Sequence, residues 1–464
     1  MEDTAPQLTV SFVAKALGLS LTGADFPIPV VTTDSRKISP GALFVAVPGE
    51  KFDGHDFIAT AVDGGARAII CRKDFPTHSA PPAEYLLVDD TVGAYRQLAK
   101  TWRAQFHCPV VAVAGSVGKT TTKELLAAAL RGKWTDVVAT RGSQNGFLGI
   151  PMTLLDLRAH HGAAVVEVGI DEIGAMEQHW ALVRPTHAVL SALGPEHLEK
   201  LIDVATVVRE ESIIMERTAA DGGTTLINLD DEHIAPLAQR FKTGAVIGFG
   251  TSARPAPQTL AGRVEGETLI VTGFGTDKGE SYSLPLPGSH NARNLLAAIT
   301  TARSVGLTWD EIREGLATFK GVAGRSQVET LHGGRTTVLC DYYNANPDSM
   351  AAGLMTLNEL AAARGLKRKC AALADMKETG AEEKALHRAL APLLKDYAVV
   401  LLNGRLMKEL EAELKARGFK GTLAHFPNAA ALGKHIKTLL REGDALIIKG
   451  SHSMQMESVW AELK

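Results

Sequence analysis

The fold of this 464-residue chain is decided by residues 110–130, which read VVAVAGSVGKTTTKELLAAAL. The first five residues are apolar and predict a buried strand, and the last eight have the pattern of a helix. Between them, Gly115 and Gly118 free backbone N–H groups that converge on an anion together with the helix N-terminus and the Lys119 ammonium. This strand–loop–helix unit predicts a phosphate-binding loop.

The loop is shorter than the common GxxxxGK[ST] pattern, because Val113 stands where the first glycine belongs. The hydroxyl of Thr120 follows the lysine and is placed to bind Mg²⁺. A glycine-rich turn that merely closes a βα unit remains an alternative. The residues expected to bind the phosphates of ATP are Gly115, Ser116, Val117, Gly118, Lys119, Thr120 and Thr121.

Composition limits the class of protein. The length predicts about three domains of roughly 150 residues. A net charge of −3 argues against a nucleic-acid partner, which needs a basic face. The acidic residues 1–4 do not resemble a signal peptide, no apolar run reaches the ~18 residues of a membrane span, and four scattered cysteines suit reduced thiols. We therefore expect a cytoplasmic protein without a membrane span, and a monomer.

Apolar runs alternate with helical periodicity along most of the chain, which predicts an α/β fold of mostly parallel sheets covered by helices. We expect a separate α/β domain over residues 1–107, a central P-loop ATPase domain with a parallel sheet over 108–320, and a Rossmann-like domain over 321–464 that lacks the GxGxxG fingerprint. Period-two stretches within 254–287 predict antiparallel hairpins added to the central domain.

Two polar side chains follow apolar strands of the central domain. Glu167 lies within the apolar run 163–169, where a carboxylate is costly unless it pairs with a cation or a metal. It is therefore a candidate Mg²⁺ ligand, with a structural ion pair as the alternative. His197 follows the next strand and is expected on the same rim of the sheet as Lys119, either as a ligand and proton-transfer group or as a solvated loop residue.

The helix expected at 203–217 carries a carboxylate on its apolar face. Its 3.6-residue spacing predicts one stripe made of Val204, Val207, Val208, Glu211 and Met215. Glu211 then points inward to a cation or a charged site, or else it lies at the edge of the stripe.

Further candidates flank the junction between the second and third domains. Asn291 and Asn294 open an Ala/Leu-rich helix and suit hydrogen bonds to a base or ribose, although capping of that helix by Ser289 or Asn291 is an alternative. Arg325 and Asp341 lie early in the third domain, across an interdomain cleft of the kind that ligands prefer.

The ordered set of motifs resembles the Mur ligase family along essentially the whole chain. Residues 33–36 (TDSR), 41–46 (GALFVA) and 49–55 (GEKFDGH) are similar to the UDP-sugar domain of two branches of that family. Residues 341–350 (DYYNANPDSM) match the branch that adds D-alanyl-D-alanine, and the DNPR signature of the branch that adds diaminopimelate is missing. Residues 449–454 (KGSHSM) match the family's final strand and turn.

The resemblance implies an ATP- and Mg²⁺-dependent amide ligase of peptidoglycan synthesis. ATP would phosphorylate the terminal carboxylate of UDP-N-acetylmuramoyl-tripeptide, and the amine of D-Ala-D-Ala would attack the acyl phosphate. By this resemblance Lys119, Glu167, His197 and Glu211 are catalytic; Thr120, Glu167, His197 and Glu211 surround the metals; and Asn291, Asn294, Arg325 and Asp341 hold the nucleotide. The implied substrate-binding residues are Ser35, Arg36, His55, Thr140, Asn145, Tyr343, Asn344 and Asn346.

Two positions depart from the family pattern. Phe147 replaces the acidic residue that follows two asparagines in the family, which predicts altered contact with the substrate. Glu211 stands where Mur ligases carry a lysine that CO₂ converts to a carbamate. We expect Glu211 to supply that carboxylate directly, whereas an alignment that placed Arg209 there would imply a weakened second metal site.

Two rival functions remain at this stage. One is another Mur-type amide ligase, which would add a single amino acid and differ only in the amine it consumes. The other is a non-catalytic protein that closes on a nucleotide and a peptidoglycan precursor without turnover.

Overall fold

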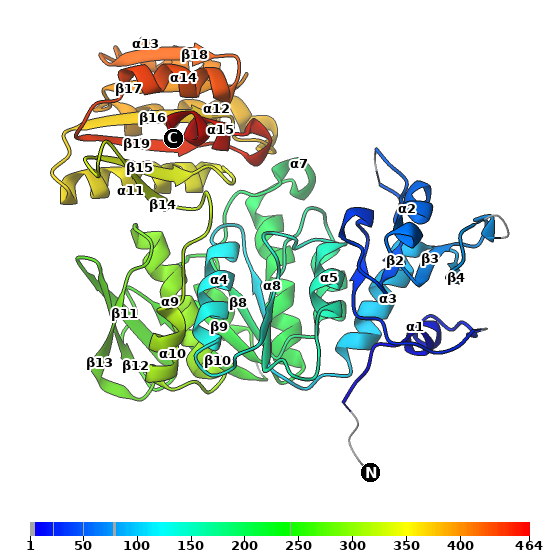
Figure 1. The fold of residues 1–464 in the computed structure, drawn as a ribbon. Helices are drawn as coiled ribbons and strands as arrows, with labels where there is room; N and C mark the ends of the chain where they lie inside the picture. The colour runs from blue at the N-terminus through cyan, green and yellow to red at the C-terminus, as the bar shows by residue number, and fades with distance from the viewer. Residues whose placement is uncertain (1–4, 22, 50, 78–79, 242) are drawn as a thin grey trace.

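The computed structural model describes residues 5–21, 23–49, 51–77, 80–241 and 243–464. The acidic residues 1–4 and Glu50 of the 49–55 motif lie outside them. Three sheets of four, nine and six strands follow one another along the chain. Figure 1 shows them as three bodies, with the nine-strand body in the middle. Each sheet is predominantly parallel, so the α/β class expected from the sequence is confirmed.

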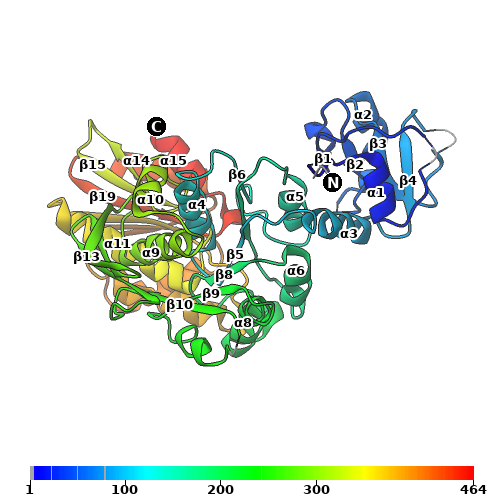
Figure 2. The ribbon, with the colours of Figure 1, turned by 90° about the horizontal axis from the view of Figure 1, so that it is seen from below.

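The N-terminal sheet is small and wholly parallel, in the order β1-β2-β3-β4. Its elements are α1 (Val10–Ala16), β1 (Val31–Thr32), β2 (Leu43–Val45), α2 (Ile58–Asp63), β3 (Ala68–Arg72) and β4 (Glu84–Val88). Short 3₁₀ turns η1 (Ser35–Lys37) and η2 (Gly54–Phe57) connect them. In Figure 2 this domain stands apart from the other two and joins them through α3 (Thr91–Arg103).

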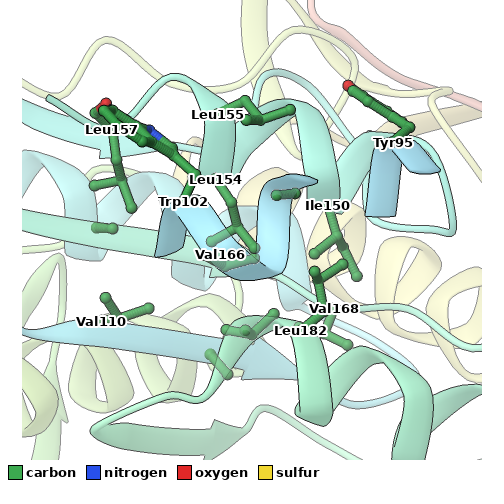
Figure 3. Packing of buried hydrophobic residues seen from close by; sticks show 14 of the residues in the cluster. Tyr95, Trp102, Val110, Ile150, Leu154, Leu155, Leu157, Val166, Val168 and Leu182 are labelled. Atoms are coloured by element: carbon green, nitrogen blue, oxygen red, sulfur yellow. The ribbon is translucent and has the colours of Figure 1, made fainter. Parts of the chain in front are cut away.

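Helix α3 ties the first domain to the second. The Asp90 side chain caps it by accepting the N–H of Val92 at 3.0 Å. Its apolar face packs on the central domain, where Trp102 donates to the Leu157 carbonyl at 3.1 Å. Figure 3 shows Tyr95 and Trp102 among aliphatic side chains of that domain. The junction is therefore part of a buried core rather than a free linker.

The central sheet has the order β13-β12-β11-β10-β9-β8-β5-β7-β6, parallel from β11 to β6. The parallel strands β5 to β10 are β5 (Val110–Ala114), β6 (Val137–Ala139), β7 (Ala163–Glu167), β8 (His187–Leu190), β9 (Thr224–Asn228) and β10 (Ala245–Gly250). The predicted antiparallel segment forms β11 (Thr259–Glu265), β12 (Thr268–Gly273) and β13 (Thr276–Ser283) at one edge.

Helices cover both faces of this sheet. One face carries α3, α5 (Gly149–Leu155), α6 (Ala175–Val183) and α8 (Val204–Ala220), and the other carries α4 (Lys119–Leu130), α9 (Ser289–Ser304) and α10 (Trp309–Leu316). The one-turn helix α7 (Leu198–Leu201) follows β8. Because β5, β7 and β8 are parallel neighbours, the loops that follow them meet at one rim of the sheet.

The C-terminal sheet has the order β14-β15-β19-β16-β17-β18, in which β14 alone is antiparallel. Its strands are β14 (Gln327–Leu331), β15 (Thr336–Asp341), β16 (Arg368–Ala374), β17 (Val399–Asn403), β18 (Thr422–Phe426) and β19 (Asp444–Lys449). Its helices are α11 (Pro347–Ala363), α12 (Glu383–Arg388), α13 (Met407–Ala416), α14 (Ala429–Leu439) and α15 (Glu457–Leu463). In Figure 1 this domain lies above the rim of the central sheet.

No helix among the described residues is long and apolar enough to cross a membrane.

Candidate active site

The phosphate loop connects β5 to α4 and has the backbone that its glycines permit. Gly115 and Gly118 have φ values of 115° and 89°, in the left-handed region that favours glycine. A Cβ at Gly118 would lie 2.5 Å from Oδ1 of Asn294, so the position is also sterically closed to other residues. Gly118 caps α4 without a side-chain bond, which leaves the N-terminal N–H groups of that helix directed at the loop.

Lys119 is the first residue of α4, and its side chain is held beneath the loop. The ammonium donates to the carbonyl of Gly115 and lies 2.7 Å from Oε1 of Glu196. Burial alone would lower the pKa of Lys119, but the carboxylates of Glu196, Glu211 and Glu167 raise it above its ordinary value. The lysine is therefore charged and lies among three acidic side chains.

Glu167 ends β7 beside the loop hydroxyl, as the sequence predicted. Its Oε1 accepts from Oγ1 of Thr120 at 3.0 Å and from Nδ2 of Asn145 at 2.8 Å. Its Oε2 is buried and has no hydrogen-bond partner within the described chain. Lys123 lies 3.8 Å from that oxygen, and it donates hydrogen bonds to Oε1 of Glu124 and to the carbonyls of Thr140 and Gly142. A buried carboxylate oxygen beside a threonine hydroxyl is the donor set that Mg²⁺ takes in such loops.

Glu211 points inward from α8, which settles one alternative left open by the sequence. Its side chain is fully buried, and Oε2 accepts the N–H of Gly115 at 2.9 Å. Burial, and after it Glu196, raises the pKa of Glu211 to about 8, although Lys119 opposes the shift. Its Oε1 is a second buried carboxylate oxygen that no described group contacts by a hydrogen bond.

His197 lies on the rim after β8 and faces the third domain. Its backbone is left-handed (φ 47°), and Nδ1 lies 2.5 Å from Oε2 of Glu378 in the C-terminal domain. Its Nε2 is 3.8 Å from Oε1 of Glu196. Among the described residues no three His, Cys, Asp or Glu side chains are grouped as a metal site. The four predicted metal ligands therefore do not form one cluster in this structure. Thr120 and Glu167 are in contact. Glu211 lies near Lys119, and His197 pairs with Glu378.

The third domain contributes a compact polar group. Asp341 ends β15 and lies 2.5 Å from Nζ of Lys449, which ends the neighbouring strand β19. The other oxygen of Asp341 accepts the N–H of Ser326 at 2.9 Å. Although burial opposes the shift, Lys449 lowers the pKa of Asp341. This ion pair is satisfied on both sides.

Arg325 reaches from the third domain to the phosphate loop. Its Nη2 donates to Oγ of Ser143 at 3.0 Å, and Ser143 Oγ lies 3.0 Å from Oγ1 of Thr120. The guanidinium lies over the Tyr343 ring, 4.2 Å from its centre. Arg325 therefore links the two domains across the cleft that the sequence predicted.

A cavity of about 600 Å³ lies between the central and C-terminal domains. Neither Ser289 nor Asn291 caps α9, whose cap residue is Gly288. Asn291 and Asn294 instead bond each other at 3.2 Å on the cavity wall. The predicted residues that line the cavity are Ser116, Val117, Gly118, Lys119, Thr120, Thr121, Asn145, Glu167, His197, Asn291, Asn294, Arg325, Asp341, Tyr343, Asn344 and Asn346.

Six predicted residues lie elsewhere. Gly115 and Glu211 bond each other and do not line the cavity, and Thr140 is buried where its hydroxyl accepts the N–H of Glu167 at 3.0 Å. In the N-terminal domain, Ser35 and Arg36 belong to η1. The ring of His55 accepts the N–H of Arg72 through Nε2 and bonds Asp53 through Nδ1.

Phe147, one of the two departures from the family pattern, lines the cavity. Its ring packs edge-on against His179 with centres 4.7 Å apart, and the guanidinium of Arg96 lies over the ring, 4.7 Å from its centre. An apolar ring therefore occupies a wall where the family pattern has an acidic residue. The buried His179 ring has a pKa lowered to about 4 by burial.

Sequence reasoning missed Glu196, Ser143, His290 and Lys449, all of which line the cavity. Glu196 precedes His197 at the end of a strand, so its position on the rim was available as a signal. Ser143 and His290 lie in loop and helix-start contexts that are common in any protein. Lys449 was visible as a lysine at the end of an apolar run, which is rare without a buried partner.

Three family models match the chain in order. The Mur ligase family catalytic domain matches residues 27–103, the Mur ligase middle domain matches 113–302, and the Mur ligase glutamate ligase domain matches 324–452.

Similar proteins cover nearly the whole chain. The UDP-N-acetylmuramoyl-tripeptide--D-alanyl-D-alanine ligase of Synechocystis sp. is 33% identical over 96% of this chain and 94% of its own length, and the Escherichia coli enzyme of that name is 34% identical over 97% of each. A crystal structure of MurF from Acinetobacter baumannii superposes with a TM-score of 0.84 at 26% identity, covering 99% of both chains. MurF from Thermotoga maritima in complex with ADP superposes with a TM-score of 0.77 at 25% identity, covering 94% of this chain and 96% of that one. The chain therefore belongs to the Mur ligase family.

Proposed function

We propose that this protein is an ATP-dependent ligase that joins D-alanyl-D-alanine to UDP-N-acetylmuramoyl-tripeptide in peptidoglycan synthesis. The observation that carries the proposal is the charged Lys119 beneath a phosphate loop, with Glu167 and Glu211 beside it and a two-domain cavity in front of it. The names and full-length coverage of the relatives supply the substrates. A monomer in the cytoplasm is part of the proposal. One chain provides both walls of the cavity, which supports the monomer.

The reaction takes two steps. The carboxylate of the tripeptide attacks the γ-phosphorus of ATP, the bond to the β-phosphate oxygen breaks, and ADP leaves. The amine of the dipeptide then attacks the carbonyl carbon of the acyl phosphate, phosphate leaves with the bonding electrons, and the amine gives up a proton. Both reactants of the first step are anions, so their approach requires positive charge at the loop.

Lys119 and the N–H groups of the loop supply part of that charge. Thr120 and the free oxygen of Glu167 are the residues that would hold Mg²⁺, and the orphaned buried oxygen fits such an ion. Mg²⁺ would neutralise charge on the transferred phosphoryl group. His197 lies on the same rim, and closure of the domains would have to part it from Glu378 before it served as a ligand.

Glu211 takes the part that a carbamylated lysine plays in the family. Its unpartnered Oε1 supports this role, because a buried carboxylate without a hydrogen bond is stabilised by a nearby cation. Lys119 already opposes the rise in the pKa of Glu211, and a metal ion near the loop would lower that raised pKa. Activity should therefore need no bicarbonate.

The remaining predicted residues are assigned either to ATP or to the UDP-muramoyl-tripeptide. Asn291, Asn294, Arg325 and Asp341 face the cavity and would hold the adenosine of ATP. Asn145, Tyr343, Asn344 and Asn346 line the same cavity near the reacting groups. Ser35, Arg36 and His55 would contact the UDP end, and Thr140 would act through Glu167, whose N–H it accepts.

A coupled phosphate-release assay tests the proposal, with ATP, Mg²⁺ and UDP-muramoyl-tripeptide supplied with or without D-Ala-D-Ala. Mass detection of the UDP-muramoyl product identifies what was added. Phosphate release and a pentapeptide product that both require the dipeptide are the expected result. Product with a single amino acid in place of the dipeptide would identify a different amide ligase. No product with lysine- or diaminopimelate-containing tripeptide would indicate a non-catalytic binder.

A further inference from the structure

Glu196 lies where two cavities adjoin, and no other carboxylate among the described residues lines both of them. It lines the 600 Å³ cavity beside the phosphate loop and also a second cavity of about 350 Å³ between the central and C-terminal domains. The other carboxylates on these walls belong to one cavity alone, such as Glu167 in the first and Glu378 in the second. A group bound to Glu196 from the second cavity would therefore face the phosphate site.

The segment that carries Glu196 is fixed to the loop. The N–H of Ser116 donates to the Ala192 carbonyl at 2.7 Å, and the Ser116 hydroxyl bonds the backbone of Gly194 at 3.0 and 3.1 Å. The carboxylate of Glu196 is therefore held at a set distance from the place where a phosphoryl group would bind. Such anchoring is what a substrate-positioning residue needs.

One oxygen of this carboxylate is already committed and the other is free. Oε1 accepts from Lys119 at 2.7 Å, whereas Oε2 is buried and lacks any hydrogen-bond partner in the described parts of the chain. A buried anionic oxygen without a partner is costly, so a cation is the ligand that this position favours. Phosphates on the loop would also compete for Lys119 and release Oε1.

The C-terminal domain supplies the other wall of the second cavity, and that wall carries both charges. Lys377 and Glu378 line it, and Lys377 lies 3.1 Å from the buried Asp375. Thr379 lines it as well, and its buried hydroxyl has no partner among the described residues. The carboxylate of Glu196 beside the loop, and the ammonium of Lys377 with the free hydroxyl on the other domain, give a small zwitterion such as a dipeptide a partner for each of its charged ends.

Resting on the proposed function, we propose that Glu196 binds the ammonium group of D-alanyl-D-alanine and so holds its nitrogen at the mouth of the phosphate site, where the nitrogen attacks after it has released a proton to water. Glu196 is then a substrate-binding residue for the amine acceptor rather than for ATP. Because the contact is ionic and partly buried, its loss acts on the affinity for an ammonium-bearing ligand and spares a ligand that lacks the amine.

The test compares two ligands on two variants. Glu196→Gln keeps the shape and removes the charge, and Glu199→Gln removes an exposed charge three residues away as the matched control. The ligands are D-Ala-D-Ala, for which KM is measured at saturating ATP and tripeptide, and propionyl-D-alanine, which lacks only the amine and is measured as an inhibitor. Glu196→Gln should raise the KM of the dipeptide at least about tenfold and leave the inhibition constant of propionyl-D-alanine within about twofold. Glu199→Gln should change neither.

Each other outcome overturns the proposal in its own way. An equal rise for both ligands means that the cavity was deformed, and a change confined to the KM of ATP means that Glu196 serves only Lys119. If Glu196→Gln does not fold, the affinities of the two ligands for the wild-type protein are compared instead. The proposal then requires D-Ala-D-Ala to bind at least about tenfold more tightly than propionyl-D-alanine. A wild-type protein that makes no pentapeptide removes the proposed function and this inference together, whereas an active wild type with an unaffected Glu196→Gln removes this inference alone.

Discussion

Lys119 and Lys449 are buried lysines at the rims of the two larger sheets, and their charges are balanced differently. In the C-terminal domain, Lys449 is 1% exposed and meets Asp341, whose two oxygens are both bonded. In the central domain, Lys119 is 9% exposed and lies among three carboxylates. Each of those carboxylates keeps one buried oxygen that no described group satisfies by a hydrogen bond.

The difference separates a charge-balanced ion pair on the cavity wall from a site whose surplus of acidic groups favours cations. A one-to-one buried pair in which both carboxylate oxygens are hydrogen-bonded is close to electrostatic balance and fixes two strands against each other. A surplus of buried carboxylate oxygens is unfavourable in the protein alone and becomes favourable when cations arrive. Mutation of Lys119 should therefore mainly lower activity, and mutation of Lys449 should mainly lower stability.

The largest effect is expected at Lys119. Lys119→Ala should lower kcat/KM for phosphate release at least about 1,000-fold, because it removes the fixed positive charge at the phosphate site. Binding of an ATP analogue, measured by calorimetry, should weaken in parallel. Circular dichroism should show an unchanged fold. Activity within tenfold of wild type would contradict the assignment of this lysine to phosphate.

Lys449 should behave in the opposite way. Lys449→Met leaves Asp341 buried without its cation, so unfolding free energy should fall by about 3 kcal/mol, as measured by denaturant titration. The double variant Lys449→Met/Asp341→Asn should recover part of that loss, because both charges are gone. A single variant as stable as wild type would show that the two lysines are not different in kind.

Glu211 tests whether the surplus at the central site serves a metal. Glu211→Ala should lower turnover about 100-fold, and added bicarbonate should not restore it. Glu211→Lys, which restores the family residue, should gain activity when bicarbonate is added, because CO₂ can convert that lysine to a carbamate. An Ala variant with normal turnover would remove Glu211 from the metal site.

The smallest effect is a pH dependence near the balanced pair. Burial, with Lys449 among the further causes, lowers the pKa of His290 to about 4. His290 therefore takes up a proton near pH 6.5 in the unfolded chain but only near pH 4 in the folded protein. Stability is lost as the pH falls through this window. Between pH 6.5 and 5 the loss from His290 should be about 1.5 kcal/mol. In His290→Gln, the free energy of unfolding should fall by about 1.5 kcal/mol less than in the wild type over that pH range, as measured by denaturant titration at each pH. A pH dependence of stability equal to that of the wild type would contradict this.

The sequence by itself determined the phosphate loop, the α/β class and the position of Glu167. Each rests on local physics. Left-handed backbone favours glycine at 115 and 118, and apolar runs that alternate with helical segments favour parallel strands. A carboxylate inside an apolar strand is costly unless a cation or a hydrogen-bond donor pairs with it. Neighbouring parallel strands then bring Glu167 to the loop. The motifs along the chain also indicated the family.

Only the tertiary structure decided which carboxylates surround Lys119. Glu196 lies 77 residues after Lys119 and Glu211 lies 96 residues after Gly115, so the packing of α8 and of the loop after β8 determines these contacts. The same holds for the two cavities, because Arg325 and Glu378 contact the central domain from the separate C-terminal domain. Spacing along a chain predicts a strand or a helix, but contacts across domains depend on how those elements pack.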